Sequence, residues 1–368
     1  MMRLHDTRPA ASGARGLRSA PRPSMLKPLA PVALLLALAL SLSPEAAAQG
    51  PGAFARFGMG ARAAVMGPQV ADVFGGASPY HNPALAPFQP GQGVEISGAL
   101  LSFDREWQAV QVGAPLRPRA GIAAGVVRGA VTGIDGRDES GYATGEFSTS
   151  DLGFFVAFGT QFSKAVSAGV GFRIYRSDLV ESIRPPTALG VNAGLALRPT
   201  DRLAVGLAVE DLFAAYNWNA SPAGGGTVKD RFPVRLRGGA AYLLGPASGA
   251  GRTVIAAEVE TQVQSTEART PGGIGTTGGF PIEQTDEADL RVADVMARVG
   301  VEHRVVEPLA LRIGVDRLFL GDSGEIRPSA GFSVSPTLGE LDLRIDYAAT
   351  LEPFGTGVAQ TATLRLNL

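Results

Sequence analysis

The strongest constraint on the fold is a strict alternation of polar and apolar residues that recurs along the chain. Residues 361–368 alternate in this way, and so do residues 341–347 and 309–316. A side-chain period of two places successive residues on opposite faces of a β-strand, so each segment has one polar and one apolar face. The sequence therefore predicts an all-β protein.

The number and the spacing of these segments favour a barrel. About fourteen of them, each of roughly ten residues, follow one another between residues 94 and 368, which matches single-chain outer-membrane barrels. Short connections such as 115–118 and 199–202 alternate with long ones such as 132–150 and 265–289. Outer-membrane barrels have short turns at the periplasmic end and long loops at the other end. We therefore predict a transmembrane antiparallel β-barrel of about fourteen strands.

The polar faces of the predicted strands carry many charges. The residues expected to line the lumen are Arg173, Arg235, Arg237, Arg298, Arg312, Asp342, Arg344 and Asp346. Burial in a dry core would cost several kcal/mol for each unpaired ion, whereas in a lumen these groups can meet water or one another. The opposite faces, with residues such as Phe154 and Phe172, would meet hydrocarbon. The alternative is a soluble barrel or propeller with a conventional apolar core, because periodicity alone does not separate the two.

Residues 1–48 read as an N-terminal extension followed by a signal peptide. Lys27 precedes an apolar run over residues 28–42, and three alanines at 46–48 form an A-x-A site before Gln49. A membrane anchor is the alternative, but a spanning helix needs about 20 apolar residues. We expect cleavage near Gln49.

The mature chain then divides into two parts. Residues 49–92 do not alternate and are rich in Gly, Ala and Pro, which predicts a plug or hatch segment. Residues 93–368 form the predicted transmembrane barrel. Two aromatic residues in a long loop, Tyr216 and Trp218, would line a hydrophobic mouth or belong to the aromatic belt at the membrane surface. Trp107 and Phe103 also fit that belt.

Composition argues against several classes of function. The chain has no cysteine and a formal net charge of -1, which exclude thiolate chemistry and give no reason to expect nucleic acid as a partner. After residue 48 the only histidines are His81 and His303, and no G-x-S-x-G sequence is present. Residues 273–278 fit G-x-G-x-x-G but lack the strand and helix that a dinucleotide site needs. We expect no catalytic activity, no cofactor and no metal.

Two motifs in the plug segment resemble a known family. Residues 60–67 read Gly-Ala-Arg-Ala-Ala-Val-Met-Gly, and residues 82–86 read Asn-Pro-Ala-Leu-Ala. They resemble the N-terminal signature of PorV/PorQ-type proteins, in the superfamily of long-chain fatty-acid transporter (FadL-like) barrels, although Val65 stands where that family has Gly. The plug or hatch motif is Gly60, Ala61, Arg62, Asn82, Pro83 and Ala84.

The resemblance implies a fourteen-stranded barrel in the cell outer membrane with its N-terminal segment in the lumen. In the PorV branch the barrel is a non-catalytic component of type IX protein secretion, and its partners would be secreted proteins or secretion-machinery subunits. In the fatty-acid branch it takes up hydrophobic small molecules past a hatch. The short mature length favours the PorV branch, with uptake as the alternative. A third hypothesis is a soluble secreted β-protein that acts as a binding module.

Overall fold

The computed structural model describes residues 50–67, 69–76, 78–179, 184–219, 227–266, 289–318, 326–338, 341–352 and 355–368. Its elements in chain order are η2 (Ala53–Arg56), α2 (Gly60–Met66), η3 (Pro83–Phe88), β1 (Gly93–Leu101), β2 (Arg105–Leu116), β3 (Ala120–Arg137), β4 (Ala143–Gln161), β5 (Val166–Asp178), β6 (Thr187–Thr200), β7 (Leu203–Leu212), β8 (Ala215–Asn219), β9 (Thr227–Arg231), β10 (Val234–Leu244), β11 (Thr253–Thr266), β12 (Asp289–Val306), β13 (Leu309–Leu318), β14 (Arg327–Val334), β15 (Thr337–Leu338), β16 (Leu341–Leu351) and β17 (Val358–Asn367). In these ranges no helix has both the length and the apolar character that crossing a bilayer requires.

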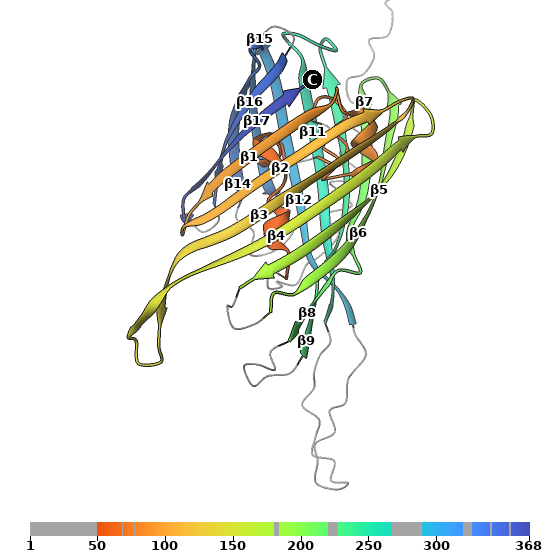
Figure 1. Cartoon of the computed structure of the whole chain (residues 1–368). Coiled ribbons are helices and arrows are strands. Elements are labelled where there is room, and N and C mark those ends of the chain that lie inside the picture. The colour runs from red at the N-terminus through yellow and green to blue at the C-terminus, as the bar shows by residue number, and fades with distance from the viewer. Residues whose placement is uncertain are drawn as a thin grey trace, which may run out of the picture.

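The described strands form a closed antiparallel barrel of fourteen strands (Figure 1), made of β1–β7, β10–β14, β16 and β17. The barrel closes where β1 pairs with β17, for example through Ile96 and Leu364. β7 pairs directly with β10, so the separate β8–β9 hairpin lies outside the wall. The predicted fold class is thereby confirmed.

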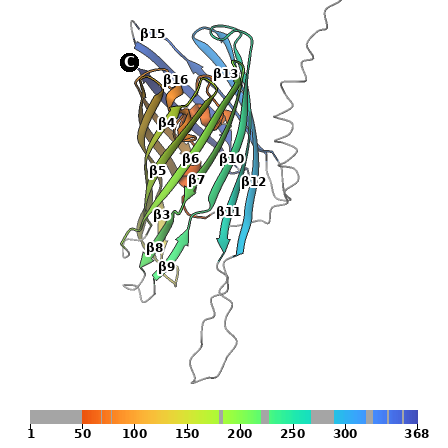
Figure 2. The same ribbon diagram turned by 90° about the vertical axis from the view of Figure 1, so that its right-hand side faces the viewer.

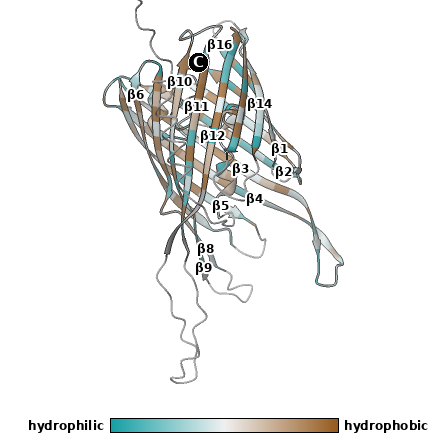
Figure 3. Ribbon diagram, turned by 180° about the vertical axis from the view of Figure 1, so that it is seen from behind, coloured by the Kyte–Doolittle hydropathy of each residue, from teal (hydrophilic) through white to brown (hydrophobic). Residues whose placement is uncertain are grey.

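The two faces of the wall differ as the alternation predicts. Large apolar side chains such as Ile174, Leu207 and Ile313 point outward and are 52%, 49% and 64% exposed. Figure 3 shows brown and teal residues alternating along the strands. The intervening residues point inward and include many buried charges. The core of the molecule is therefore its lumen.

The connections are unequal at the two ends of the barrel. β2 and β3, β6 and β7, and β12 and β13 are joined by tight turns at the end where the C-terminus lies (Figure 1). At the opposite end β3 and β4 continue beyond the wall as a two-stranded ribbon, in which Ile134 pairs with Phe147. The loop predicted over residues 132–150 was therefore wrong for most of its length. Gly133, Gly136 and Gly145 interrupt the alternation there and hide the strands from the sequence pattern.

Two other predicted loops also need correction. The connection after β7 contains β8 and β9, which pair through Tyr216 and Asp230. The predicted loop at 265–289 is shorter at both ends, because β11 reaches Thr266 and β12 begins at Asp289. Residues 267–288 lie outside the described chain.

The described residues between 50 and 92, which we call the hatch segment, lie within the lumen (Figure 2). Its helix α2 packs against β12–β14, β16, β17 and β1, and its helix η3 packs against β2–β6. The hatch segment thus contacts opposite sides of the wall.

Candidate functional site

The first hatch motif attaches α2 to the wall. Gly60 has a φ of 83°, a conformation that favours glycine, and an added Cβ would overlap the carboxylate of Glu95. The backbone N–H of Ala61 donates to Thr363 Oγ1 at 2.7 Å. Arg62 is buried and donates from Nε to Glu302 Oε2 at 2.8 Å, and it also pairs with Asp72 within the hatch segment. Each motif residue thus has its own contact.

The second hatch motif attaches the opposite side. The fully buried Asn82 donates from Nδ2 to the carbonyl of Val70 at 2.7 Å and to that of Leu195 on β6 at 3.2 Å. Its Oδ1 accepts from the N–H of Ala84 at 3.0 Å, which caps η3. The carbonyl of Ala84 in turn accepts from Ser167 Oγ at 2.9 Å. Asn82 therefore bridges the hatch segment and the wall, in addition to forming a turn with Pro83.

Inward-facing glycines allow this close approach. A Cβ added to any of them would overlap the hatch backbone or the Asn82 side chain; they are Gly121, Gly159, Gly169, Gly194, Gly206, Gly300 and Gly314. We call this set the glycine track. It lies on β3–β7, β12 and β13. Because no side chain intervenes, the hatch backbone lies directly on the wall.

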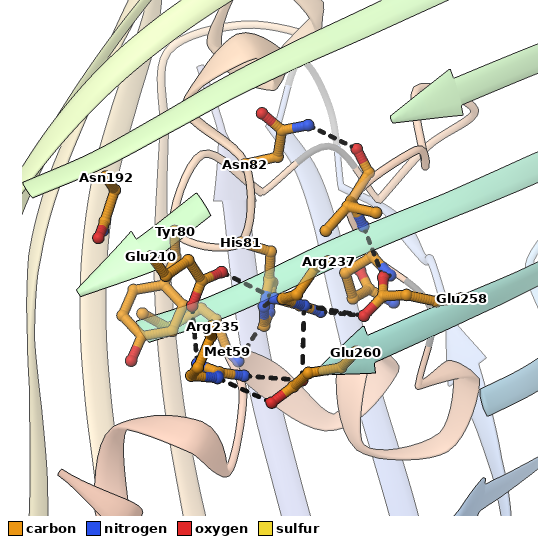
Figure 4. A network of polar contacts seen from close by, with 12 residues as sticks. Met59, Tyr80, His81, Asn82, Asn192, Glu210, Arg235, Arg237, Glu258 and Glu260 are labelled. Atoms are coloured by element: carbon orange, nitrogen blue, oxygen red, sulfur yellow. Dashed lines mark hydrogen bonds and ion pairs between the residues drawn. The ribbon is translucent and has the colours of Figure 1, made fainter. Parts of the chain in front are cut away.

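Beside the glycine track lies a network of ion pairs (Figure 4). Arg235 donates to Glu210 at 2.7 Å and to Glu260 at 2.8 Å. Arg237 pairs with Glu210 at 2.9 Å and with Glu258 at 2.5 Å. Glu258 also accepts the backbone N–H groups of hatch residues Gln69 and Val70, at 2.8 and 3.0 Å. The wall charges therefore neutralise one another and hold the hatch segment.

The other predicted lumen residues belong to the network around Glu210 and Glu260, to a second cluster around Glu302, or to the rim of the barrel. Arg173 is buried and donates to the carbonyl of Tyr80 at 2.5 Å, and Arg298 bridges Glu260 and Asp316. Arg312, Arg344 and Asp346 form a second cluster around Glu302. Asp342 lies at the rim near the C-terminus, where it is exposed and accepts from Asn367 Nδ2 at 3.0 Å.

Two buried hatch residues complete the network. His81 Nε2 accepts the N–H of Met59 at 3.1 Å, and its Nδ1 lies 3.4 Å from Arg237 Nη1. Burial, together with Arg237, holds the pKa of His81 well below its usual value. Burial also raises the pKa of Tyr80 to about 12. A lone histidine in the sequence carried no signal for this role, because its partners are distant in sequence.

A cavity of about 520 Å³ lies in the lumen between the hatch segment and the long-loop end. Its aromatic lining comes from Phe54, Phe57 and Tyr80 of the hatch segment and from Trp107 of β2. Trp107 is only 2% exposed, and its Nε1 donates to the carbonyl of Phe54 at 3.1 Å. The prediction that Trp107 belongs to an outer aromatic belt was therefore wrong. The opposite lining is charged and includes Arg298 and Arg317.

A β-bulge shapes the charged side of this cavity. Ala297 pairs with Leu318 but Val299 pairs with Val315, so β13 carries one extra residue. Arg317 lies in this bulge with a φ of 60°, which is strained for a residue other than glycine. Its Nε is buried and has no hydrogen-bond partner among the described residues. The cavity is therefore lined by aromatic side chains on one side and by charged side chains, including Arg317, on the other.

The aromatic residues of the long loop have a structural role. Tyr216 is 2% exposed and packs against Phe232 with ring centroids 4.9 Å apart. Phe232 stacks on Tyr175 at 4.7 Å, and Trp218 packs on Tyr216 at 5.7 Å. The cluster ties the β8–β9 hairpin to β5. Among the described residues no group of three or more His, Asp and Glu side chains could hold a metal ion.

Comparison with solved structures identifies the same architecture in hydrocarbon transporters. The Ralstonia pickettii toluene transporter TbuX is similar with a TM-score of 0.54 and 11% identity, over 85% of this chain and 98% of that one. The Pseudomonas putida toluene transporter TodX matches with a TM-score of 0.52 and 13% identity, over 88% and 98%. The CymD monoaromatic hydrocarbon channel matches with a TM-score of 0.51 and 12% identity, over 84% and 97%.

These similarities show a shared fold. No protein-family model matches the sequence, and no curated protein matches it. The PorV/PorQ subtype therefore stays a prediction from the sequence motifs.

Proposed function

We propose that the protein is an outer-membrane channel that takes up hydrophobic small molecules. The observation that carries this proposal is the cavity of about 520 Å³, which is lined by Phe54, Phe57 and Trp107 and bounded by the hatch segment. Ligand pockets for small molecules typically have volumes of this order and aromatic walls. The barrels of similar fold include channels for monoaromatic hydrocarbons. The comparisons thus favour uptake, which was the alternative, over the secretion role that the motifs favoured.

The outer surface supports a membrane location. The large apolar side chains Ile96, Phe158 and Phe172 on the outer face are 51%, 42% and 51% exposed, and exposed apolar surface of this kind marks a membrane or partner contact. We expect the protein to stay in the membrane pellet after a carbonate wash and to migrate as a heat-modifiable band. Release by the wash would instead support the soluble binding module.

The chemistry of the cavity defines the substrate class. The aromatic side suits an apolar body, and the guanidinium group of Arg317 on the charged side would donate to a polar or anionic end. Toluene and octanoate are therefore suitable probes, because they differ in that end. Tighter binding of octanoate would assign the guanidinium a role, and equal binding would leave recognition to the aromatic side chains.

A cavity-filling variant tests the proposal directly. Val131 lines the cavity, so Val131→Trp should weaken binding of both probes at least about tenfold, equivalent to about 1.4 kcal/mol. Val156→Trp makes the same change on the outer face, where Val156 is 48% exposed, and should leave binding unchanged. Isothermal titration of the detergent-solubilised protein measures both. Unchanged binding by Val131→Trp would place the ligand elsewhere.

The β3–β4 ribbon keeps protein secretion as a second candidate function. It projects beyond the barrel (Figure 1), and its residues Tyr142 and Phe147 are 74% and 45% exposed. Its strands continue past their neighbours in the wall, so their outer edges are available for pairing with another chain. A photo-crosslinker at Tyr142 in intact cells should capture exported proteins if the ribbon binds them. Crosslinks to lipid alone would exclude this role.

A further inference from the structure

A second charged cluster lies on the other side of the hatch segment from the cavity and contains more arginines than carboxylates. Its members are Arg62, Arg252, Arg312, Arg344, Asp72, Glu302 and Asp346. Four guanidinium groups face three carboxylates, so one positive charge is left over. All members except Arg344 are buried, and none of them lines the cavity. An unbalanced charge in such a place is costly unless a counter-ion compensates it.

The unpaired donors in this cluster belong to Arg62 and Arg312. The Nε atoms of Arg62 and Arg312 donate to the same oxygen, Glu302 Oε2, at 2.8 and 2.7 Å. Their Nη1 atoms are also engaged, that of Arg62 with Asp72 and that of Arg312 with Asp346 at 2.7 Å. Both Nη2 atoms are buried and have no hydrogen-bond partner among the described residues. Arg62 and Arg312 are only 5% and 2% exposed.

The chemistry of the guanidinium group shows what is missing. Nε–H and Nη2–H lie on one edge, which a carboxylate or a similar anion normally fills with two parallel hydrogen bonds. Here two such edges share one carboxylate oxygen, so each is half filled. An acceptor that carries negative charge would complete both edges and neutralise the surplus charge.

We propose that a small monovalent anion, for which chloride is the simplest candidate, binds between Nη2 of Arg62 and Nη2 of Arg312. Arg62 belongs to the hatch segment and Arg312 to β13, so the anion would connect the hatch segment to the wall. Hatch attachment would then depend on the anion present. This inference does not depend on the substrate of the cavity.

Crystals of the wild-type protein soaked in sodium bromide test the site directly. The expected result is an anomalous bromine peak within hydrogen-bond distance of both Nη2 atoms, which is lost on back-soaking into gluconate. Anomalous peaks at the protein surface but not in this cluster would overturn the proposal. Density that remains unchanged after the exchange would also overturn it, because it would be water.

Two variants test the role of the surplus positive charge and the role of the Nη2 donors separately. Arg312→Gln removes the Nη2 donor of Arg312 and should abolish the bromide peak, but it also removes the ion pairs of Arg312 with Glu302 and Asp346. Arg252→Gln removes the surplus charge while leaving both Nη2 atoms, and it should lower the bromide occupancy several-fold. Arg105→Gln is the matched control, because Arg105 pairs with Glu352 outside the cluster. Equal occupancy in all variants would contradict an electrostatic site.

Discussion

His81 holds the hatch segment through a contact that depends on the protonation state of its imidazole ring. Its Nε2 must be unprotonated to accept the N–H of Met59, and its Nδ1 faces Arg237. Arg235 and Arg173 add further positive charge nearby, and Glu210 supplies the negative charge. Protonation would remove an acceptor and place a cation against guanidinium groups. The attached hatch segment therefore requires a neutral His81.

This requirement predicts a pH dependence. The pKa of His81 is lowered in the attached state, so its stabilising contribution is complete above the ordinary value of about 6.5 and is lost as the pH falls below it. We expect the hydrogen-exchange protection factor of the Met59 amide to fall as the pH drops below about 6.5. His81→Gln should flatten this profile. An identical fall in the variant would show that another group titrates.

At the scale of elements, the glycine track makes the wall and the hatch segment one packed unit. Gly314→Val would force a side chain into the carbonyl of Val65, and overpacking of this kind costs about 1–3 kcal/mol. We expect the hatch segment to shift and the conductance in planar bilayers to rise. Gly98→Val is the matched control, because an added Cβ there meets no atom within 4 Å. Equal conductance in both variants would mean that the hatch segment does not close the lumen.

The sequence pattern could predict the strands but not how they are joined through side chains. Alternation indicated the barrel and the polar face that carries Arg235 and Arg237, because strand periodicity is local. It could not show that Arg62 contacts Glu302, since these residues are 240 positions apart in sequence. The β3–β4 ribbon and the bulge at Arg317 were missed for another reason. Glycines and an extra residue break the period on which the prediction depended.

At the scale of the whole molecule, the hatch segment separates the aromatic cavity from the Glu302 cluster. The hatch segment contacts opposite sides of the wall, with the aromatic cavity on the long-loop side and the Glu302 cluster on the short-turn side. A hydrophobic molecule that enters from the long-loop end would reach the cavity before it meets the hatch segment. The ion pairs beyond make the polar part of the lumen a poor path for such a molecule.

The uptake of radiolabelled toluene and octanoate by Gram-negative cells that lack their own hydrocarbon and fatty-acid channels tests this account most directly. We predict that wild-type protein and Val156→Trp raise the initial uptake rate of at least one probe, and that Val131→Trp at equal membrane abundance does not. Uptake by Val131→Trp at the wild-type rate would contradict passage through the cavity. No increase with the wild-type protein would contradict the proposed uptake of these molecules.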